Sequence, residues 1–185
     1  MYPSASKTRS ITIAAVLTAV GIIIPMIMPI KLIIGPASYT LGSHIPINMA
    51  MFVSPIVASV VAIGTTIGFQ AAGFPAVIVA RAFTHLFYAT IGAYMIDKNK
   101  ALLAQTSSRF AFSFIINIIH AIGEIAVVYA FTTLGMSQQS ENFLYVLFVL
   151  VGLGTLVHGM VDFELSYQFT KILHKRSGKT FVNFA

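Results

Sequence analysis

The chain contains no cysteine and very few charged residues. The absence of cysteine excludes disulfides, thiol nucleophiles and metal sites with cysteine ligands. Charged residues make up only 9% of the 185 residues, whereas a soluble domain carries about 25% because it covers its surface with them. Lipid must therefore surround most of the surface, and we predict a polytopic helical membrane protein.

Apolar residues form 57% of the chain and come in long runs. Each run is long enough to cross a hydrocarbon core, which needs about 20 helical residues. The runs cover residues 11–30, 45–69, 75–96, 110–134 and 143–169. The first is longer than the apolar part of a usual signal peptide, and no A-x-A cleavage site follows it, so we interpret it as a retained spanning helix. The second contains Ser54-Pro55, a sequence that disfavours a continuous helix.

The basic residues favour six spans rather than five. They gather near the two ends of the chain and in one loop, at Lys7, Arg9, Lys98, Lys100, Arg109, Lys171, Lys175, Arg176 and Lys179. Six spans place all nine on one side, as the positive-inside rule requires, and leave Lys31 in an outer loop. Both termini are then expected on the cytoplasmic side. Because this topology explains the net charge of +6, a nucleic-acid partner is not needed.

The predicted fold class is all-α, a single integral membrane domain over residues 1–185 with six transmembrane helices. The helices are expected at residues 8–29, 43–53, 55–72, 75–97, 107–134 and 142–174. The second is too short to span alone, so it forms a broken pair with the third around Pro55. Residues 31–43 form the longest outer loop, which is long enough to close over a ligand.

Arg81 is an ionisable residue inside the predicted fourth helix. Such residues are costly in lipid and tend to face a cavity or the bundle interior. Its guanidinium fits a carboxylate bidentately, so it is a candidate for binding an anionic solute. The alternative is a structural ion pair, with Glu124 as the partner. His85 lies one turn further on the same face and can be a structural residue or part of the same site.

Asn117, His120 and Glu124 lie on one face of the predicted fifth helix, because their spacings are three and four residues. They supply the donors and acceptors that a polar solute needs, at the depth that Arg81 reaches from the other direction. Hydrogen bonding between helices is the alternative. In the sixth helix, His158 is interpreted as structural, and Asp162 and Glu164 can pair with loop lysines.

The sequence lacks the motifs of several kinds of metal site and enzyme. The histidines do not form a ligand set at i, i+4 spacing on one helix, so no metal site is expected. The chain has no HExxH sequence and no Walker lysine, and no Ser–His–Asp order is recognisable. We therefore do not expect an enzyme. A self-sufficient secondary transporter remains an alternative, although no inverted repeat is visible.

Size, topology and one motif together resemble a known family. A six-helix chain with a basic N-terminus, a broken second span and Ala15-x-x-x-Ala19 on its first helix is similar to the S-component, the substrate-binding subunit, of an energy-coupling factor (ECF) transporter. Residues 35–46 (GPASYTLGSHIP) and 74–82 (FPAVIVARA) resemble the branch that binds pantothenate or a similar vitamin precursor.

This resemblance implies a vitamin pocket in the outer half of the bundle, covered by the loop between helices 1 and 2. It also implies that the bundle topples in the bacterial cytoplasmic membrane to release the vitamin inside. The energy would come from a membrane-coupling subunit and two ATPase subunits that use ATP, with no cofactor in this chain. Ala15 and Ala19 would dock on the membrane-coupling subunit.

The resemblance also assigns roles to residues. Arg81 would bind the vitamin carboxylate and Asn117 its amide or hydroxyls. Ser38 and Tyr39 would lie in the lid, and Phe74 and His85 would line the pocket wall. The chain has no tryptophan to stack a flat vitamin, which favours a flexible, anionic one such as pantothenate. Nicotinate, pyridoxine and hydroxymethylpyrimidine remain alternatives.

Overall fold

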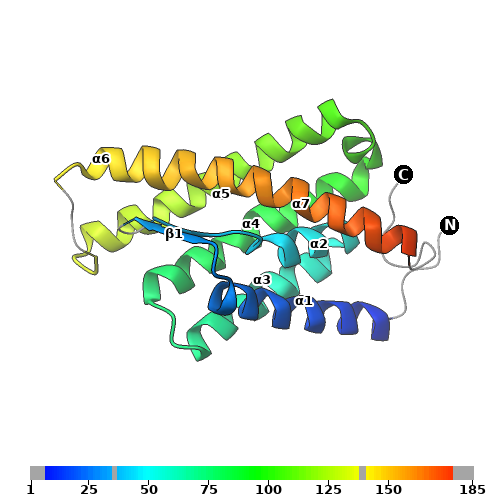
Figure 1. Ribbon diagram of the computed structural model, residues 1–185, viewed down its shortest axis with the longest axis horizontal. Coiled ribbons are helices and arrows are strands. Elements are labelled where there is room, and N and C mark those ends of the chain that lie inside the picture. The colour runs from blue at the N-terminus through cyan, green and yellow to red at the C-terminus, as the bar shows by residue number, and fades with distance from the viewer. Residues whose placement is uncertain (1–6, 35–36, 138–140, 177–185) are drawn as a thin grey trace.

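The computed structural model describes residues 7–34, 37–137 and 141–176, which form an elongated helical bundle with one short hairpin (Figure 1). In chain order the elements are α1 (Lys7–Ile27), β1 (Lys31–Ile34), β2 (Ala37–Thr40), α2 (Ile45–Val53), α3 (Pro55–Ala71), α4 (Ala76–Lys98), the 3₁₀ helix η1 (Lys100–Leu103), α5 (Thr106–Thr133), α6 (Phe143–Tyr145), the π-helix η2 (Val146–Leu153) and α7 (Gly154–Arg176).

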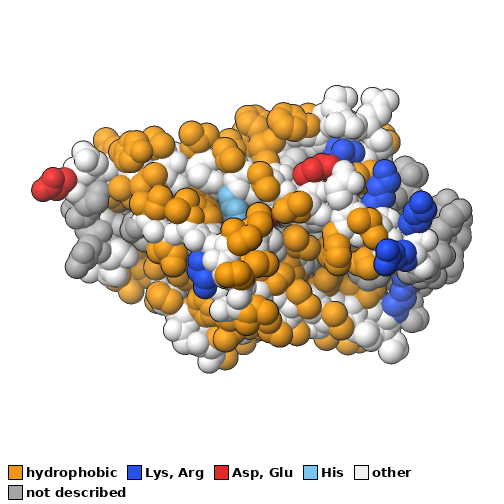
Figure 2. Space-filling model, in the orientation of Figure 1, with side chains coloured by type: hydrophobic (Ala, Val, Ile, Leu, Met, Phe, Trp, Pro, Cys, Tyr) orange, Lys and Arg blue, Asp and Glu red, His pale blue; other side chains and the backbone are white. Residues whose placement is uncertain are grey.

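Four helical segments are long and apolar enough to cross a membrane. They are α1, α4, α5 and the continuous run Phe143–Arg176 formed by α6, η2 and α7. Large apolar side chains point outward along these segments, and they cover most of the face in Figure 2. The predicted helical membrane bundle is therefore confirmed. Six spans remain a prediction, because α3 has 17 residues and α2 only nine.

The predicted break at Pro55 is confirmed. Ser54 has an extended backbone, with φ −170° and ψ 161°, as expected for a residue that precedes proline. Its hydroxyl accepts a hydrogen bond from the backbone N–H of Val57 at 3.2 Å and so caps α3. Pro55 occupies the first turn, where its missing N–H costs nothing. The first helix of the pair therefore ends after nine residues, and α3 begins at Pro55.

The short helix α2 lies at the centre of the bundle. Seven of its nine residues are buried, and it contacts α1, α3, α4 and α7. A helix that is apolar on all sides needs such an enclosed position. Because α2 begins midway along the bundle, its first residues lie in the interior rather than at a surface.

Glycines allow α1 and α3 to approach closely. A Cβ atom at Gly64 would lie 2.8 Å from Cγ2 of Thr18, and one at Gly68 would overlap the side chain of Ile22. The small-residue stripe Gly64-x-x-x-Gly68 therefore serves packing within the chain, in the manner common for membrane helices.

The hairpin of β1 and β2 corrects the all-α prediction. Its strands are antiparallel, with Lys31 opposite Thr40 and Ile34 opposite Ala37. Each strand has four residues, too few for an alternating pattern to stand out from a loop. Gly35 and Pro36, part of the stretch that resembles the pantothenate branch, lie outside the described residues, as does Lys179.

One end of the bundle carries most of the basic side chains. The start of α1, the connection between α4 and α5, and the end of α7 lie together at this end in Figure 1. Lys and Arg side chains gather there on the face that Figure 2 shows. The arrangement is the one that the positive-inside rule predicts, and the side of the membrane that this end faces stays a prediction.

A candidate ligand pocket at the start of the central helix

A cavity lies where α2 begins, beneath the hairpin. It offers about 90 Å³ for the centres of water molecules. The space therefore suits a small solute. Six segments supply its polar lining: β2, the turn before α2, and helices α3, α4, α5 and α7. The polar lining residues are Ser38, Tyr39, Thr40, Ser43, His44, Thr65, Arg81, His85, His120, Glu124, Thr155 and His158.

Arg81 and Glu124 form an ion pair in the wall of this cavity. Nε of Arg81 donates to Oε2 of Glu124, and both residues are buried. The other guanidinium nitrogens reach β2: Nη1 lies 3.2 Å from the hydroxyl of Ser38, and Nη2 lies 3.5 Å from its carbonyl oxygen. The two sequence-based alternatives for Arg81 are thus compatible, because it pairs with Glu124 and still borders the cavity.

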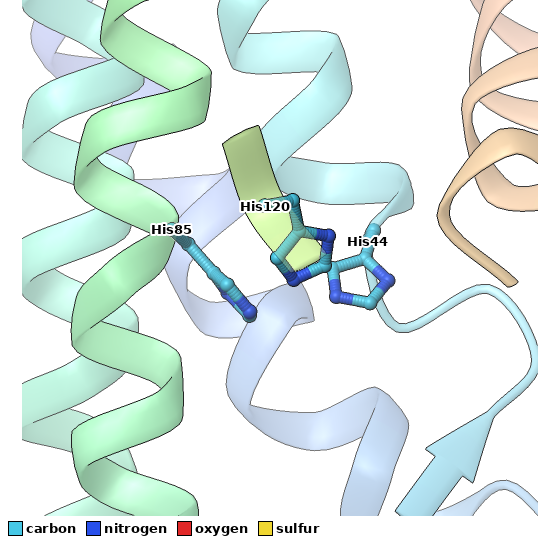
Figure 3. A group of neighbouring side chains, drawn as sticks. All are labelled: His44, His85 and His120. Atoms are coloured by element: carbon cyan, nitrogen blue, oxygen red, sulfur yellow. The ribbon is translucent and has the colours of Figure 1, made fainter. Parts of the chain in front are cut away.

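Four histidines surround the cavity. The rings of His44, His85 and His120 are mutually 4.8–4.9 Å apart, centroid to centroid. Figure 3 shows these three rings pointing toward one another from the turn before α2, from α4 and from α5. The fourth ring, His158 of α7, lies 5.0 Å from His44 and 5.3 Å from Tyr39. Four neighbouring imidazole rings therefore line the cavity.

Asp162 fixes the start of α2 from the neighbouring helix α7. Its carboxylate accepts hydrogen bonds from the backbone N–H of Gly42 at 2.8 Å and of His44 at 3.0 Å, and Nδ1 of His44 lies 3.1 Å away. Gly42 has a φ of 78°, a conformation that favours glycine. Asp162 is completely buried, so the hypothesis that it pairs with loop lysines is wrong. Glu164, two residues further on, pairs with Arg109 instead.

Tyr39 connects the hairpin to η2. Its hydroxyl donates to the carbonyl of Leu150 and lies 3.3 Å from that of Val151. Gly154 makes room for the ring, since a Cβ atom there would overlap the phenol. Burial raises the pKa of the Tyr39 hydroxyl, so it stays protonated and able to donate. A π-helix at such a contact is typical of functional sites.

Some polar atoms around the cavity lack a partner within the described part of the chain. Neither ring nitrogen of His120 has a hydrogen bond, and the hydroxyl of Tyr88 is also unpaired and buried. The nearest acceptor for His120, Oε1 of Glu124, lies 3.5 Å from Nε2, which is too long for a good hydrogen bond. Buried groups of this kind normally have a partner, and here a bound solute can provide one.

The residues proposed from sequence are not all in the cavity. Arg81, His85, His120, Glu124, Ser38 and Tyr39 line it. Asn117 instead donates to the carbonyl of Ser113 at 2.8 Å, and Phe74 stacks on Phe69, which is the ring that lines the cavity. Whether these two residues meet a vitamin stays a prediction.

Sequence reasoning missed His44 and gave His158 and Asp162 other roles. The signal available was the position of His44 directly before the broken span, where the chain enters the interior.

Ala15 and Ala19 lie on the outside of α1, away from the cavity. Both are exposed, and they line an apolar groove between α1 and α3 together with Ser10, Ile11, Ala14, Thr18, Ile22, Ile56, Val57, Val60 and Gly64. Docking on this surface remains a prediction.

Similarity to a known protein identifies the family of this chain. Neither a family model nor a solved structure matches the chain. The chain is 45% identical over 170 residues to the niacin transporter NiaX of Lactococcus lactis subsp. cremoris (strain MG1363), a match that covers 92% of this chain and 77% of the relative. A relative this similar over most of both chains shows that this multi-pass membrane protein belongs to the family of the niacin transporter NiaX.

Proposed function

We propose that this chain is the substrate-binding S-component of an ECF-type importer, and that its cavity binds nicotinate. The single observation that carries the proposal is the buried cavity that holds one arginine among unpaired polar groups, in a chain whose relative is named a niacin transporter. The role is that of a transport subunit rather than an enzyme.

The carboxylate of nicotinate would bind the guanidinium of Arg81. Nη1 and Nη2 lie 3.2 and 3.5 Å from Ser38, and the carboxylate would form charge-assisted hydrogen bonds with the guanidinium on this side. The pyridine ring would lie among the imidazoles, where a neutral histidine can donate an N–H to the ring nitrogen. Ser38 and Tyr39 of the hairpin would then cover the ligand.

Nicotinate suits this cavity better than pantothenate does. A space of about 90 Å³ for water centres fits a single ring with one carboxylate and is tight for a branched chain with an amide and two hydroxyls. Flat ligands can stack on histidine or Phe69 without tryptophan. The name of the relative also favours nicotinate, which was one of the alternatives to pantothenate in the sequence analysis.

Calorimetric titration of the purified chain tests the ligand. Nicotinate should bind more tightly than nicotinamide, its neutral analogue, by at least about tenfold, because only the acid can form a charge-assisted bond with Arg81. Pantothenate and pyridoxine serve as the other ligands. Tight binding of pantothenate without binding of nicotinate would support pantothenate as the ligand instead. Equal affinity for nicotinate and nicotinamide would contradict a bond between Arg81 and the carboxylate.

Arg81→Lys tests the residue while it keeps a charge beside Glu124. The lysine loses the guanidinium fork, so the affinity for nicotinate should fall roughly 10- to 100-fold. Arg109→Lys is the matched control, because Arg109 also pairs with a glutamate but lies far from the cavity lining. A similar loss in both variants would indicate a general structural effect.

Docking on an energising module is tested on the α1 groove. Ala15→Trp and Ala19→Trp should leave nicotinate binding unchanged and abolish uptake by cells that express the module, because the exposed groove would be filled. Ala111→Trp on the exposed face of α5 is the matched control. Normal uptake by the α1 variants would contradict docking there. Uptake by the chain alone in liposomes would favour a stand-alone transporter.

A further inference from the structure

The three converging imidazoles have the composition of a metal site with an open position. One nitrogen from each of His44, His85 and His120 lies within 4.8 Å of the other two. The rings come from three different elements (Figure 3), which is why spacing along one helix could not reveal them. Zinc binds imidazole nitrogen at about 2.0–2.1 Å, and sites with three histidines keep a fourth, exchangeable position.

The surroundings of His44 match those of a metal ligand. Asp162 contacts Nδ1 of His44 at 3.1 Å, which leaves Nε2 for another partner. A carboxylate behind a ligating histidine fixes the tautomer and orients the ring. On the other side, Oε1 of Glu124 lies 3.5 Å from Nε2 of both His85 and His120, close enough to offset the charge of an ion.

His120 provides an independent observation. It is 2% exposed, and neither of its nitrogens has a hydrogen-bond partner within the described residues. Buried polar nitrogens normally have a partner, and a bound ion would provide one for His120. Its neighbours His44 and His85 contact it through their rings, and a shared ion would satisfy all three together.

The balance of buried charge also favours a cation. Asp162 and Glu124 are both buried carboxylates, and Arg81 neutralises Glu124. Among the described residues, Asp162 makes ion-pair contacts with His44 and His158. A buried carboxylate needs a compensating charge, and a divalent ion on His44 would supply it.

A second group, His44, His158 and Asp162, also has its atoms close together. Its carboxylate, however, is already occupied by two backbone N–H groups and by His44, and His158 lies 3.4 Å from the hydroxyl of Ser43. Hydrogen bonds therefore account for this group, whereas they do not account for His120.

We propose that His44, His85 and His120 bind one divalent transition-metal ion of the zinc class inside the cavity. Imidazole is a ligand for zinc, copper and nickel rather than for magnesium or calcium. The ion's fourth position would open into the cavity that Arg81 also borders. This site does not depend on which vitamin the cavity binds.

The test uses the full chain purified with a tag that contains no histidine and stripped with a chelator. Added Co²⁺ should bind at one ion per chain and give the visible absorption of a tetrahedral site, and Zn²⁺ should displace it. Zn²⁺ should also raise the unfolding temperature, because it binds the folded state. These measurements use the wild-type chain and no vitamin, so their outcome is separate from that of nicotinate binding.

Variants identify the ligands. His85→Gln and His120→Gln should each weaken Zn²⁺ binding by at least about 100-fold, more than the loss of an outer partner costs. His158→Gln and His174→Gln, the matched controls, should bind Zn²⁺ like the wild type. The proposal is overturned if the wild-type chain binds no stoichiometric metal, or if His158→Gln loses the ion while His85→Gln keeps it.

Discussion

Asp162 shows how one buried side chain determines the position of several others. Its carboxylate holds the backbone of Gly42 and His44 and orients the ring of His44. The first N–H groups of a helix have no partner within the helix, and here a carboxylate from α7 meets this need for α2. The start of α2, and with it one wall of the cavity, is thereby attached to α7.

Replacing Asp162 by Asn should therefore destabilise the protein strongly. The amide can accept one of these bonds but has no charge, and hydrogen bonds to charged groups contribute about 1.5–3 kcal/mol each. We expect a loss of about 2–3 kcal/mol, measured as a lower midpoint of thermal unfolding in detergent.

Glu164→Gln is the control for this substitution, because it lies on the same helix and pairs with Arg109 at a half-exposed position. Its cost should stay below about 1 kcal/mol. Equal shifts of the midpoint in both variants would contradict the special role of Asp162.

Single residues of the candidate site could be predicted from the sequence where a charged residue lies in an otherwise apolar helix. Arg81 and Glu124 stood out as charges in apolar helices, and they do meet in the wall of the cavity. His44 did not stand out, because its neighbours are 41 and 76 residues away along the chain, at His85 and His120. Contact between residues so far apart in the chain depends on how the helices pack, and no local sequence pattern predicts it.

Among the elements, the hairpin depends on few contacts with the rest of the bundle. Ala37 is buried, but all four residues of β1 are exposed. The bond from Tyr39 to Leu150 joins it to η2, and Arg81 joins it to α4. Elements with few buried contacts open most readily, so the hairpin is the part of the cavity wall best suited to admit a ligand.

Tyr39→Phe should speed ligand release without unfolding the bundle. The phenylalanine keeps the ring but loses the donor to Leu150, so the hairpin opens more often. We expect the dissociation rate of nicotinate to rise roughly tenfold, as loss of one hydrogen bond of about 1.4 kcal/mol would cause. Stopped-flow displacement measures this rate.

Tyr129→Phe, at an exposed position on α5, provides the comparison. An unchanged dissociation rate in Tyr39→Phe would mean that the hairpin does not limit release.

Helix boundaries were predicted within a few residues, because proline and glycine mark them. Ser54-Pro55 separates α2 from α3, and Gly73, with a φ of 77°, precedes Pro75 at the start of α4. The hairpin and the π-helix were not predicted. The former is short, and the latter differs from an α-helix in hydrogen bonding rather than in composition.

For the whole molecule, the natural absence of cysteine makes topology directly measurable. Single cysteines can be placed at Ala104, between η1 and α5, and at Met136, after α5; both positions are exposed. If the basic end faces the cytoplasm, a membrane-impermeant maleimide should label Met136→Cys in intact cells and Ala104→Cys only after permeabilisation. The opposite labelling pattern would reverse the predicted orientation, and the unmodified chain is the control.

The position of α2 also limits how a solute can cross. This helix fills the middle of the bundle on the basic side of the cavity, and Met49, Ala50, Met51 and Phe52 are at most 3% exposed. The cavity therefore has a floor of tightly packed side chains, which a vitamin cannot pass while the bundle keeps this form. We therefore expect a carrier rather than a channel, in which the cargo leaves by the opening through which it entered.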